Sequence, residues 1–152
     1  MPGIFVDSPV GSLYVHEEGG RIDRVSWSRN AGGEVTPLLK EAKRQLLAYF
    51  AGERTGFNLP LAPAGSPFQQ AVYLMMQQIP YGETRTYGDL ARELDSAAQP
   101  VGGACGSNPI PIIIPCHRVV AVNGLGGFSG GNGLITKRTL LRLEGALFEL
   151  PL

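Results

Sequence analysis

A run of β-branched residues interrupted by a proline constrains the fold of this chain more than any other feature. Residues 112–120 read Ile-Ile-Ile-Pro-Cys-His-Arg-Val-Val. Apolar runs of this kind typically form buried strands, and Pro115 interrupts the strand because proline cannot donate to a sheet ladder. The break lies where Cys116, His117 and Arg118 begin. A thiol at a rigid break beside an imidazole indicates a nucleophile rather than a packing residue.

The composition excludes several classes of protein. The chain has 152 residues, 43% of them hydrophobic and 17% charged, which is typical of a folded protein. It contains no apolar stretch long enough to cross a bilayer and no signal-peptide pattern at its N-terminus. Cys105 and Cys116 cannot build a disulfide framework, and with His16 and His117 they match no zinc motif. We therefore expect a cytoplasmic protein without a metal site or a membrane partner.

The formal net charge is zero, because 13 basic residues balance 13 acidic ones. Phosphate affinity depends on clustered Lys and Arg, so this balance argues against a general nucleic-acid binder. A local basic patch stays open as an alternative. Its candidates in the second half, some of them ordinary solvated surface, are Arg85, Arg92, Arg118, Lys137, Arg138 and Arg142.

The sequence pattern changes at a proline-containing segment, residues 57–65, which reads as an extended linker. Before it, residues 3–28 alternate short apolar runs with turn residues, which predicts a small antiparallel sheet. Residues 38–50 place apolar side chains at intervals of three and four, which predicts an amphipathic helix. We therefore predict an α+β fold, with an N-terminal supporting domain and linker over residues 1–63 and a mainly helical C-terminal domain over residues 64–152.

The C-terminal domain is expected to contain a helix-turn-helix. Ser66 with Gln69 three residues later is a capping pattern that starts one helix, and Thr86 with Asp89 starts another. A segment of very small residues, 100–106, follows after a short connection. Two short helices joined by a tight connection match the helix-turn-helix outline.

Three glycines within residues 102–106 require an explanation, because glycine destabilises a helix interior by roughly 0.5–1 kcal/mol relative to alanine. One explanation is a small-faced helix that approaches a nucleic-acid groove. The others are tight packing against a neighbouring helix, or a loop. The spacing by itself favours tight packing or a loop.

A series of short blocks beyond the linker follows a specific order and spacing. The blocks are Pro-Tyr-Gly at 80–82, Thr-Tyr-Gly-Asp-Leu-Ala at 86–91, Val-Gly-Gly-Ala at 101–104, Asn-Pro-Ile-Pro at 108–111, Ile-Pro-Cys-His-Arg-Val at 114–119, Gly-Phe-Ser-Gly-Gly at 127–131, Lys137, Leu-Leu at 140–141, and Leu-Glu-Gly at 143–145. Together they resemble the O6-alkylguanine-DNA alkyltransferases, also called methylated-DNA–protein-cysteine methyltransferases. The resemblance covers essentially the full chain and is greatest to the shorter bacterial forms.

The resemblance implies DNA repair by direct transfer of an alkyl group, such as methyl, from O6-alkylguanine, with O4-alkylthymine as a further candidate substrate. Cys116 would accept the group, His117 would activate the thiol through a water, and Glu144 would orient His117. A base is needed, because a free cysteine with a pKa of about 8.5 is mostly protonated at neutral pH. No cofactor is implied. The thioether product would not be cleaved, so each molecule would act once.

The resemblance also implies a pocket for a flipped base, since chemistry on a base inside a duplex requires that the base leave the stack. Tyr87 would donate to the ring nitrogen of the leaving guanine, and Asn108 would brace the turn that carries the active-site strand. Cys105 is interpreted as a packing residue of the small-residue segment. The other positions expected at the substrate or the DNA, with Cys105, are Gln99, Gly102, Gly103, Ala104, Gly106, Arg118, Val119, Phe128 and Ser129, and Gly130 and Gly131 would keep the rim open.

Two positions depart from the family pattern. Members of the family usually carry Arg-Ala before the Val-Gly pair, where the arginine fills the space of the flipped nucleotide, whereas this chain has Gln99-Pro100. Glutamine can insert into the base stack and form hydrogen bonds, but it offers no charge. Gln99 is therefore expected to fill the space of the flipped nucleotide less effectively than arginine. At Phe128 a tyrosine is common, so packing on the base could persist while a hydroxyl contact could not.

Three functions stay open on the sequence. The first is the single-turnover methylated-DNA–protein-cysteine S-methyltransferase, a monomer that acts on double-stranded DNA without an obligate protein partner. The second is a non-catalytic binder of alkylated DNA, which the intact Cys116 motif argues against and Gln99 keeps open. The third is a cysteine hydrolase that uses Cys116, His117 and Glu144, turns over repeatedly and ignores DNA. Without the resemblance, Glu144 itself reads as a solvated carboxylate at a helix end.

Overall fold

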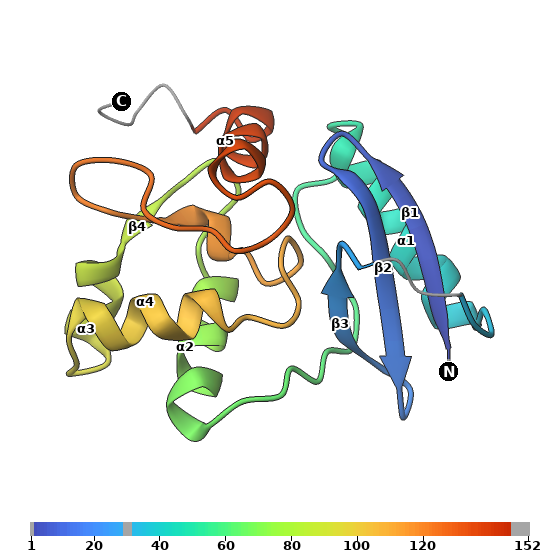
Figure 1. The fold of residues 1–152 in the computed structure, drawn as a ribbon, viewed down its shortest axis with the longest axis horizontal. Coiled ribbons are helices and arrows are strands. Elements are labelled where there is room, and N and C mark those ends of the chain that lie inside the picture. Colours follow the sequence, from blue (N-terminus) through green and yellow to red (C-terminus); the bar gives the residue numbers. More distant parts are fainter. Residues whose placement is uncertain (1, 29–31, 147–152) are drawn as a thin grey trace.

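The computed structural model describes residues 2–28 and 32–146, in which a small sheet with one helix lies beside a helical lobe (Figure 1). The sheet is an antiparallel meander of β1 (Gly3–Ser8), β2 (Gly11–Glu18) and β3 (Arg21–Ser26), in that order. The predicted meander is confirmed, and so is the α+β class of the fold.

Helix α1 (Pro37–Phe50) covers one face of the sheet, as expected for its apolar spacing. It starts at Thr36, whose hydroxyl accepts a hydrogen bond from the backbone N–H of Leu39 at 3.1 Å. Leu39, Leu46 and Tyr49 on its inner face are fully buried. Tyr49 lies in the last turn of α1, and its hydroxyl contacts Glu144 in the second half of the chain.

The expected linker is extended and lies along β3. The backbone N–H of Ile22 donates to Pro60 O, and that of Ala62 donates to Ile22 O, both at 2.8 Å. Further along the same strand, Val25 N–H donates to Pro109 O at 3.0 Å. The linker and a loop of the C-terminal half therefore cover the outer edge of β3, which protects the strand from pairing with another chain.

The second half is mainly helical, as predicted. Helix α2 (Pro67–Gln77) and helix α3 (Tyr87–Glu93) both start with a complete capping box, formed by the Ser66–Gln69 and Thr86–Asp89 pairs. Helix α4 (Ala98–Gly106) follows α3 after residues 94–97 and packs against α2 and α3. The expected pair of short helices with a tight connection is therefore present.

The last described helix is α5 (Leu134–Leu143), which lies against the 3-10 turn η1 (Cys116–Arg118). Next to it, the short strands β4 (Arg85–Thr86) and β5 (Val119–Val120) pair in parallel. Residues 147–152, which end the expected C-terminal domain, lie outside the described residues.

The expectation of buried strand on both sides of Pro115 is half wrong. Val119–Val120 form β5, but Ile112–Ile114 lie in a turn in which Ile114 N–H donates to Ile110 O at 2.9 Å and Ile112 has a φ of +75°. Such a conformation costs a β-branched residue about 1–3 kcal/mol, so it persists only where the surroundings hold it. Here the isoleucines are buried by tertiary packing, which their apolar character predicts, rather than by a sheet, which it does not.

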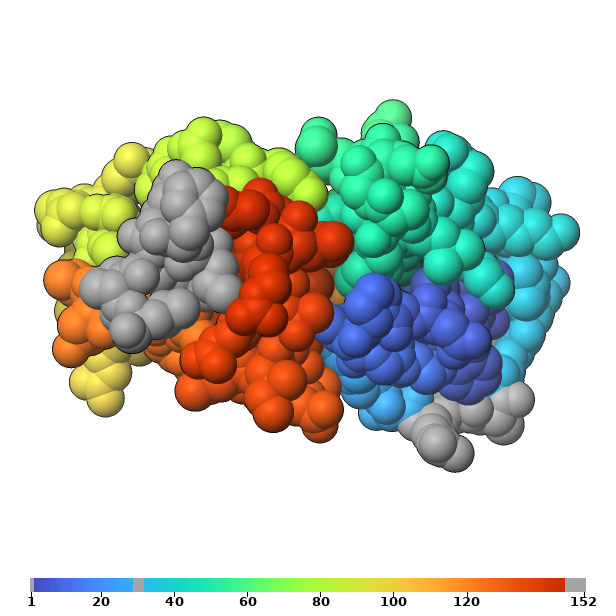
Figure 2. Space-filling view, turned by 90° about the horizontal axis from the view of Figure 1, so that it is seen from above, coloured from blue at the N-terminus to red at the C-terminus, as the bar shows by residue number. Residues whose placement is uncertain are grey.

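One hydrophobic core joins the two halves of the chain. It includes Val15 and Leu46 from the N-terminal half and Met76, Ile110 and Leu140 from the C-terminal half. In Figure 2 the red segment around α5 lies directly beside the blue and green N-terminal residues. The junction between the halves is therefore a packed interface, and the candidate site lies at it.

Candidate active site

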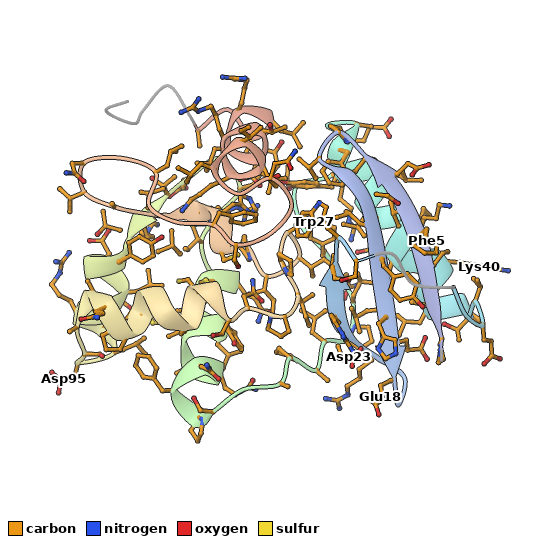
Figure 3. The ribbon with its side chains drawn as sticks, in the orientation of Figure 1. Phe5, Glu18, Asp23, Trp27, Lys40 and Asp95 are labelled. Carbon is orange, nitrogen blue, oxygen red and sulfur yellow. The ribbon has the colours of Figure 1, made fainter. Side chains whose placement is uncertain are left out.

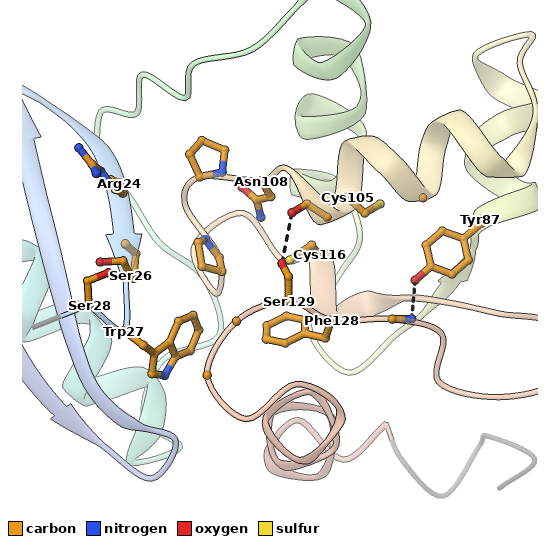
Figure 4. A pocket seen from close by; sticks show the side chains of 18 residues that line it. Arg24, Ser26, Trp27, Ser28, Tyr87, Cys105, Asn108, Cys116, Phe128 and Ser129 are labelled. Carbon is orange, nitrogen blue, oxygen red and sulfur yellow. Dashed lines mark hydrogen bonds between the residues drawn. The ribbon is translucent and has the colours of Figure 1, made fainter.

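A cavity of about 900 Å³ opens beside Cys116 at the junction of the two halves (Figure 4). Tyr87, Gly102 and Phe128 line it from the C-terminal side. Trp27 at the end of β3 lines it from the N-terminal side, where Figure 3 shows the indole between the sheet and the C-terminal lobe. The cavity is large enough for a purine base together with a substituent.

Cys116 begins η1 at the floor of the cavity and is only 8% exposed. The Asn108 side chain holds the preceding turn, since its Oδ1 accepts from Ile110 N–H at 3.0 Å and its Nδ2 donates to Ile114 O at 2.8 Å. Burial raises the pKa of the Cys116 thiol, while a hydrogen bond with Asn108 and the positive charge of Lys137 oppose that rise. The thiol therefore needs a base to lose its proton at neutral pH.

His117 is fully buried beside the thiol, and its ring is oriented by Glu144. The Nε2 of His117 lies 2.7 Å from Glu144 Oε2. A carboxylate accepts, so the hydrogen of the neutral ring is on Nε2 and the lone pair is on Nδ1. Among the described residues, Nδ1 has no hydrogen-bond partner. Burial lowers the pKa of His117 and outweighs the Glu144 carboxylate, which raises it.

Glu144 ends α5 and is buried, so the interpretation of a solvated carboxylate at a helix end is wrong. Arg118 donates to both of its oxygens, through Nε at 2.8 Å to Oε1 and through Nη2 at 3.0 Å to Oε2. The Tyr49 hydroxyl donates to Oε2 at 2.5 Å, and Gly82 N–H reaches Oε1 at 3.4 Å. Burial raises the pKa of Glu144, but the hydrogen bonds from His117 and Arg118 hold it well below its usual range.

Tyr87 begins α3 and directs its hydroxyl across the cavity to the loop after β5. Its Oη accepts from Gly127 N–H at 3.3 Å, and burial raises its pKa, so the hydroxyl keeps its proton at neutral pH. Behind the ring lies the buried Lys137 ammonium, 5.7 Å from the ring centre. Lys137 donates to Val119 O at 2.7 Å and to Gly127 O at 2.9 Å, and burial lowers its pKa to about 8.

The loop of residues 127–131 forms the rim of the cavity. Ser129 Oγ donates to Gly106 O at 3.2 Å, which ties the loop to the end of α4. Phe128 meets Trp27 edge to face, with the ring centres 6.4 Å apart. A Cβ added at Gly130 would lie 2.4 Å from the Trp27 ring. The space beside this glycine is therefore filled by the indole and is not an open part of the rim.

The glycines of α4 do not pack against a neighbouring helix. A Cβ added at Gly103 or Gly106 would meet no atom of residues 2–28 and 32–146 within 4 Å, and one at Gly102 would just reach the Tyr87 ring at 3.9 Å. The interpretation by tight packing or a loop is therefore wrong, because the segment is helical and its small face is open. Ala104 and Cys105 face the other way and are buried, and burial raises the pKa of Cys105 to about 12.

Three expected contact residues lie apart from the floor of the cavity. Gln99 is exposed in the first turn of α4, outside the residues that line the cavity. Arg118 is buried in its pair with Glu144 and also donates to Ile79 O at 2.7 Å, so its side chain faces the interior of the protein. The Val119 carbonyl already accepts from Lys137.

The expected basic patch is mostly dispersed. Arg118 and Lys137 are buried, whereas Arg85 pairs with Glu83 and Arg92 pairs with Asp89. The remaining candidates, Arg138 and Arg142, are exposed on α5.

Within the part of the chain that the structure describes, no group of three or more His, Cys, Asp and Glu side chains could hold a metal ion. No helix of the described ranges is long and apolar enough to cross a membrane.

Sequence reasoning missed two contributions of the N-terminal half, which was expected only to support the second domain. Trp27 lines the cavity, and Tyr49 donates to Glu144. The sequence gives a partial indication of Trp27, which is the only tryptophan of the chain and lies at the end of a predicted strand. Nothing local indicates that Tyr49 reaches a residue 95 positions away.

Two family models match adjacent parts of the chain. Residues 67–146 match the DNA-binding domain of 6-O-methylguanine DNA methyltransferase, and residues 4–63 match the ribonuclease-like domain of 6-O-methylguanine DNA methyltransferase.

Curated relatives match over nearly their whole length. The constitutive methylated-DNA–protein-cysteine methyltransferase of Bacillus subtilis is 43% identical, with 91% of this chain and 92% of the relative covered. The methylated-DNA–protein-cysteine methyltransferase of Methanosarcina acetivorans is 48% identical, with 92% of this chain and 96% of the relative covered.

Solved structures agree with the fold. The crystal structure of Mycobacterium tuberculosis OGT in complex with DNA superimposes with a TM-score of 0.84 at 40% identity, covering 97% of this chain and 94% of the other. The crystal structure of Mycobacterium tuberculosis O6-methylguanine methyltransferase gives a TM-score of 0.83 at 39% identity, covering 95% of this chain and 93% of the other.

Proposed function

The chain belongs to the 6-O-methylguanine DNA methyltransferase family and repairs DNA by direct transfer of an alkyl group to itself, and on this premise we propose that Cys116 is the acceptor. The substrate is O6-alkylguanine in duplex DNA, flipped into the cavity beside the thiol. The observation that carries this proposal is the buried Cys116 in the wall of the cavity, next to His117, whose Nδ1 has no hydrogen-bond partner among the described residues.

The thiol is activated by a relay of three residues. Glu144 holds the hydrogen of His117 on Nε2, which leaves Nδ1 as the base. Adjacent side chains rarely face one another, so the proton of Cys116 passes to Nδ1 through a water. The nearby Lys137 ammonium stabilises the thiolate, since it opposes the rise in pKa that burial causes.

The transfer is one displacement. The Cys116 Sγ–carbon bond forms while the bond between that carbon and O6 breaks, and the electron pair stays on guanine. The Tyr87 hydroxyl, which lines the cavity and keeps its proton, protonates a ring nitrogen of the leaving base. The product is a thioether, which the chain has no group to cleave, so the protein acts once.

The open glycine face of α4 is the contact with the duplex. Gly103 and Gly106 allow the helix backbone to approach a groove closely, because no side chain stands out from this face. Gln99 in the first turn of α4 fills the gap that the flipped nucleotide leaves. Base extrusion costs roughly a few kcal/mol, least for a damaged base, and the weakened pairing of the lesion supplies part of it.

The protein acts as a monomer in the cytoplasm. Cys105 and Cys116 are both free, and a reactive thiol of this kind needs a reducing compartment. The two halves of one chain already form both walls of the cavity, so a second copy is not required.

One experiment tests the assignment. The protein is incubated with duplex DNA that carries O6-methylguanine, and the modified peptide is mapped by mass spectrometry. One methyl group per molecule on Cys116 is expected in the wild type and in Cys105→Ser, and none in Cys116→Ser. Binding of the duplex without transfer would instead identify a lesion binder, and methyl on any other residue would refute the acceptor.

A further inference from the structure

The Tyr49 hydroxyl enters the relay from the N-terminal half of the chain. It donates to Glu144 Oε2 at 2.5 Å, and the same oxygen receives the Nε2 hydrogen of His117 at 2.7 Å. Arg118 Nη2 also donates to this oxygen at 3.0 Å, so three donors share one acceptor atom, and Tyr49 is the one that comes from the N-terminal half. This arrangement gives α1 a direct connection to the base that activates Cys116.

The position of Tyr49 is held by packing, so the hydroxyl has little freedom. The side chain is fully buried, and its ring contacts those of Phe50, Phe57 and Tyr81 at centre distances of 5.2, 5.4 and 6.1 Å. Burial, together with the Glu144 carboxylate, raises the pKa of Tyr49, so the hydroxyl stays protonated and always donates.

Among the groups of the relay, His117 is the one whose protonation a change at Tyr49 would affect. Arg118 neutralises the Glu144 carboxylate from one side. The positive charges of Arg118 and Lys137 both act on the His117 ring, and both disfavour imidazolium. A donor to Oε2 withdraws charge from the oxygen that faces Nε2, and a less negative oxygen stabilises imidazolium less.

We propose that Tyr49 is a positioning residue of the relay, through which the N-terminal half lowers the proton affinity of His117 and keeps its ring neutral. Arg118 and Gly82 still hold the carboxylate when the Tyr49 hydroxyl is removed, so the main effect is on the charge of Oε2 rather than on its position. A neutral ring matters, because only the unprotonated Nδ1 accepts the proton of Cys116. The catalytic consequence rests on the proposed function, but the effect on His117 does not.

The test is an NMR titration of the histidine rings in the full chain. The chain has only two histidines, and a His16→Gln variant assigns their signals. In Tyr49→Phe the pKa of His117 should rise by about 0.5 to 1 unit. Tyr81→Phe is the matched control, since it removes a hydroxyl from the same aromatic cluster that donates to Leu143 O instead of Glu144.

A fluorotyrosine at position 49 covers the case in which Tyr49→Phe does not fold. Its more acidic hydroxyl donates more strongly, so the pKa of His117 should fall instead of rise. An unchanged His117 titration, or the same shift in Tyr81→Phe, would overturn the proposal. The rate of methyl transfer from O6-methylguanine duplex gives a second readout, because its acid limb should move with the His117 pKa. Absence of transfer in every sample, with the NMR shift present, would refute the proposed function alone.

Discussion

Trp27 at the end of β3 occupies the space in which a side chain at Gly130 would lie. An ideal Cβ at Gly130 would be 2.4 Å from the indole ring and 3.1 Å from Phe128. The indole is itself fixed, because its Nε1 donates to Val10 O at 2.8 Å. The loop that forms the rim of the cavity is therefore seated against the N-terminal half.

We expect Gly130→Ala to destabilise the fold by about 1–3 kcal/mol, because overpacking forces the indole or the loop to shift. Denaturant unfolding measures the change, and methyl transfer should slow with it. Gly124→Ala is the control, since a Cβ there would meet no atom of the described part of the chain within 4 Å. In a Trp27→Leu background, Gly130→Ala should lower the free energy of unfolding much less than in the wild type. Equal losses in the Trp27→Leu and wild-type backgrounds would show that the contact between the indole and residue 130 is unimportant.

Glu144→Gln should destabilise the protein by about 3–5 kcal/mol at neutral pH, since it leaves the buried Arg118 charge without its partner. The pKa of Glu144 is lower in the folded than in the unfolded protein, so its stabilisation is present above the unfolded value of about 4.5 and is lost as the pH falls below it. The difference between wild type and variant in urea unfolding should therefore shrink on acidification. A difference that stays constant down to pH 3 would contradict this expectation.

Lys137→Met should slow methyl transfer at neutral pH by about tenfold, because one unit of thiol pKa changes the thiolate fraction tenfold. The Lys137 ammonium lowers the pKa of Cys116, and this charge would be gone. Lys40→Met removes an exposed lysine from α1, outside the candidate basic patch, and is the control that should leave the rate unchanged. Transfer rates measured against pH should show the Lys137→Met profile moved to higher pH, and an unmoved profile would exclude the electrostatic role.

The same lysine should leave a signature in the pH dependence of stability. Burial lowers the pKa of Lys137 to about 8 in the folded protein, below the ordinary value of 10.5. Between these values the unfolded chain binds more protons, so this group makes stability rise with pH from about 8 to 10.5. Urea unfolding of the wild type should show this rise relative to Lys137→Met, and parallel curves would contradict it.

Gln99→Arg should tighten binding to duplex DNA and steepen its salt dependence by about one counterion, because it adds one charge at the exposed start of α4. Transfer should also quicken if extrusion of the base limits the rate. Gln78→Arg adds the same charge at the exposed end of α2 and should change binding less. Equal affinity of Gln99→Arg and the wild type would show that position 99 does not reach the duplex.

Local signals predicted the elements of this fold well. The capping pairs Ser66–Gln69 and Thr86–Asp89 start α2 and α3 as expected, because a cap is formed by residues within one turn. The turn at residues 112–114 could not be predicted in this way, since the Asn108 side chain and the surrounding core hold its backbone.

The sequence by itself determined the family and most of the elements, and its ordered motifs singled out the candidate trio Cys116, His117 and Glu144, because caps, apolar periodicity and motifs are patterns of residues close together in the chain. Only the tertiary structure decided what surrounds that trio. Tyr49 reaches Glu144 across 95 positions, and Trp27 fills the space beside Gly130. These contacts depend on how the sheet packs against the helical lobe. Contacts between side chains far apart in the chain leave no pattern in the local sequence, so the sequence alone does not predict them.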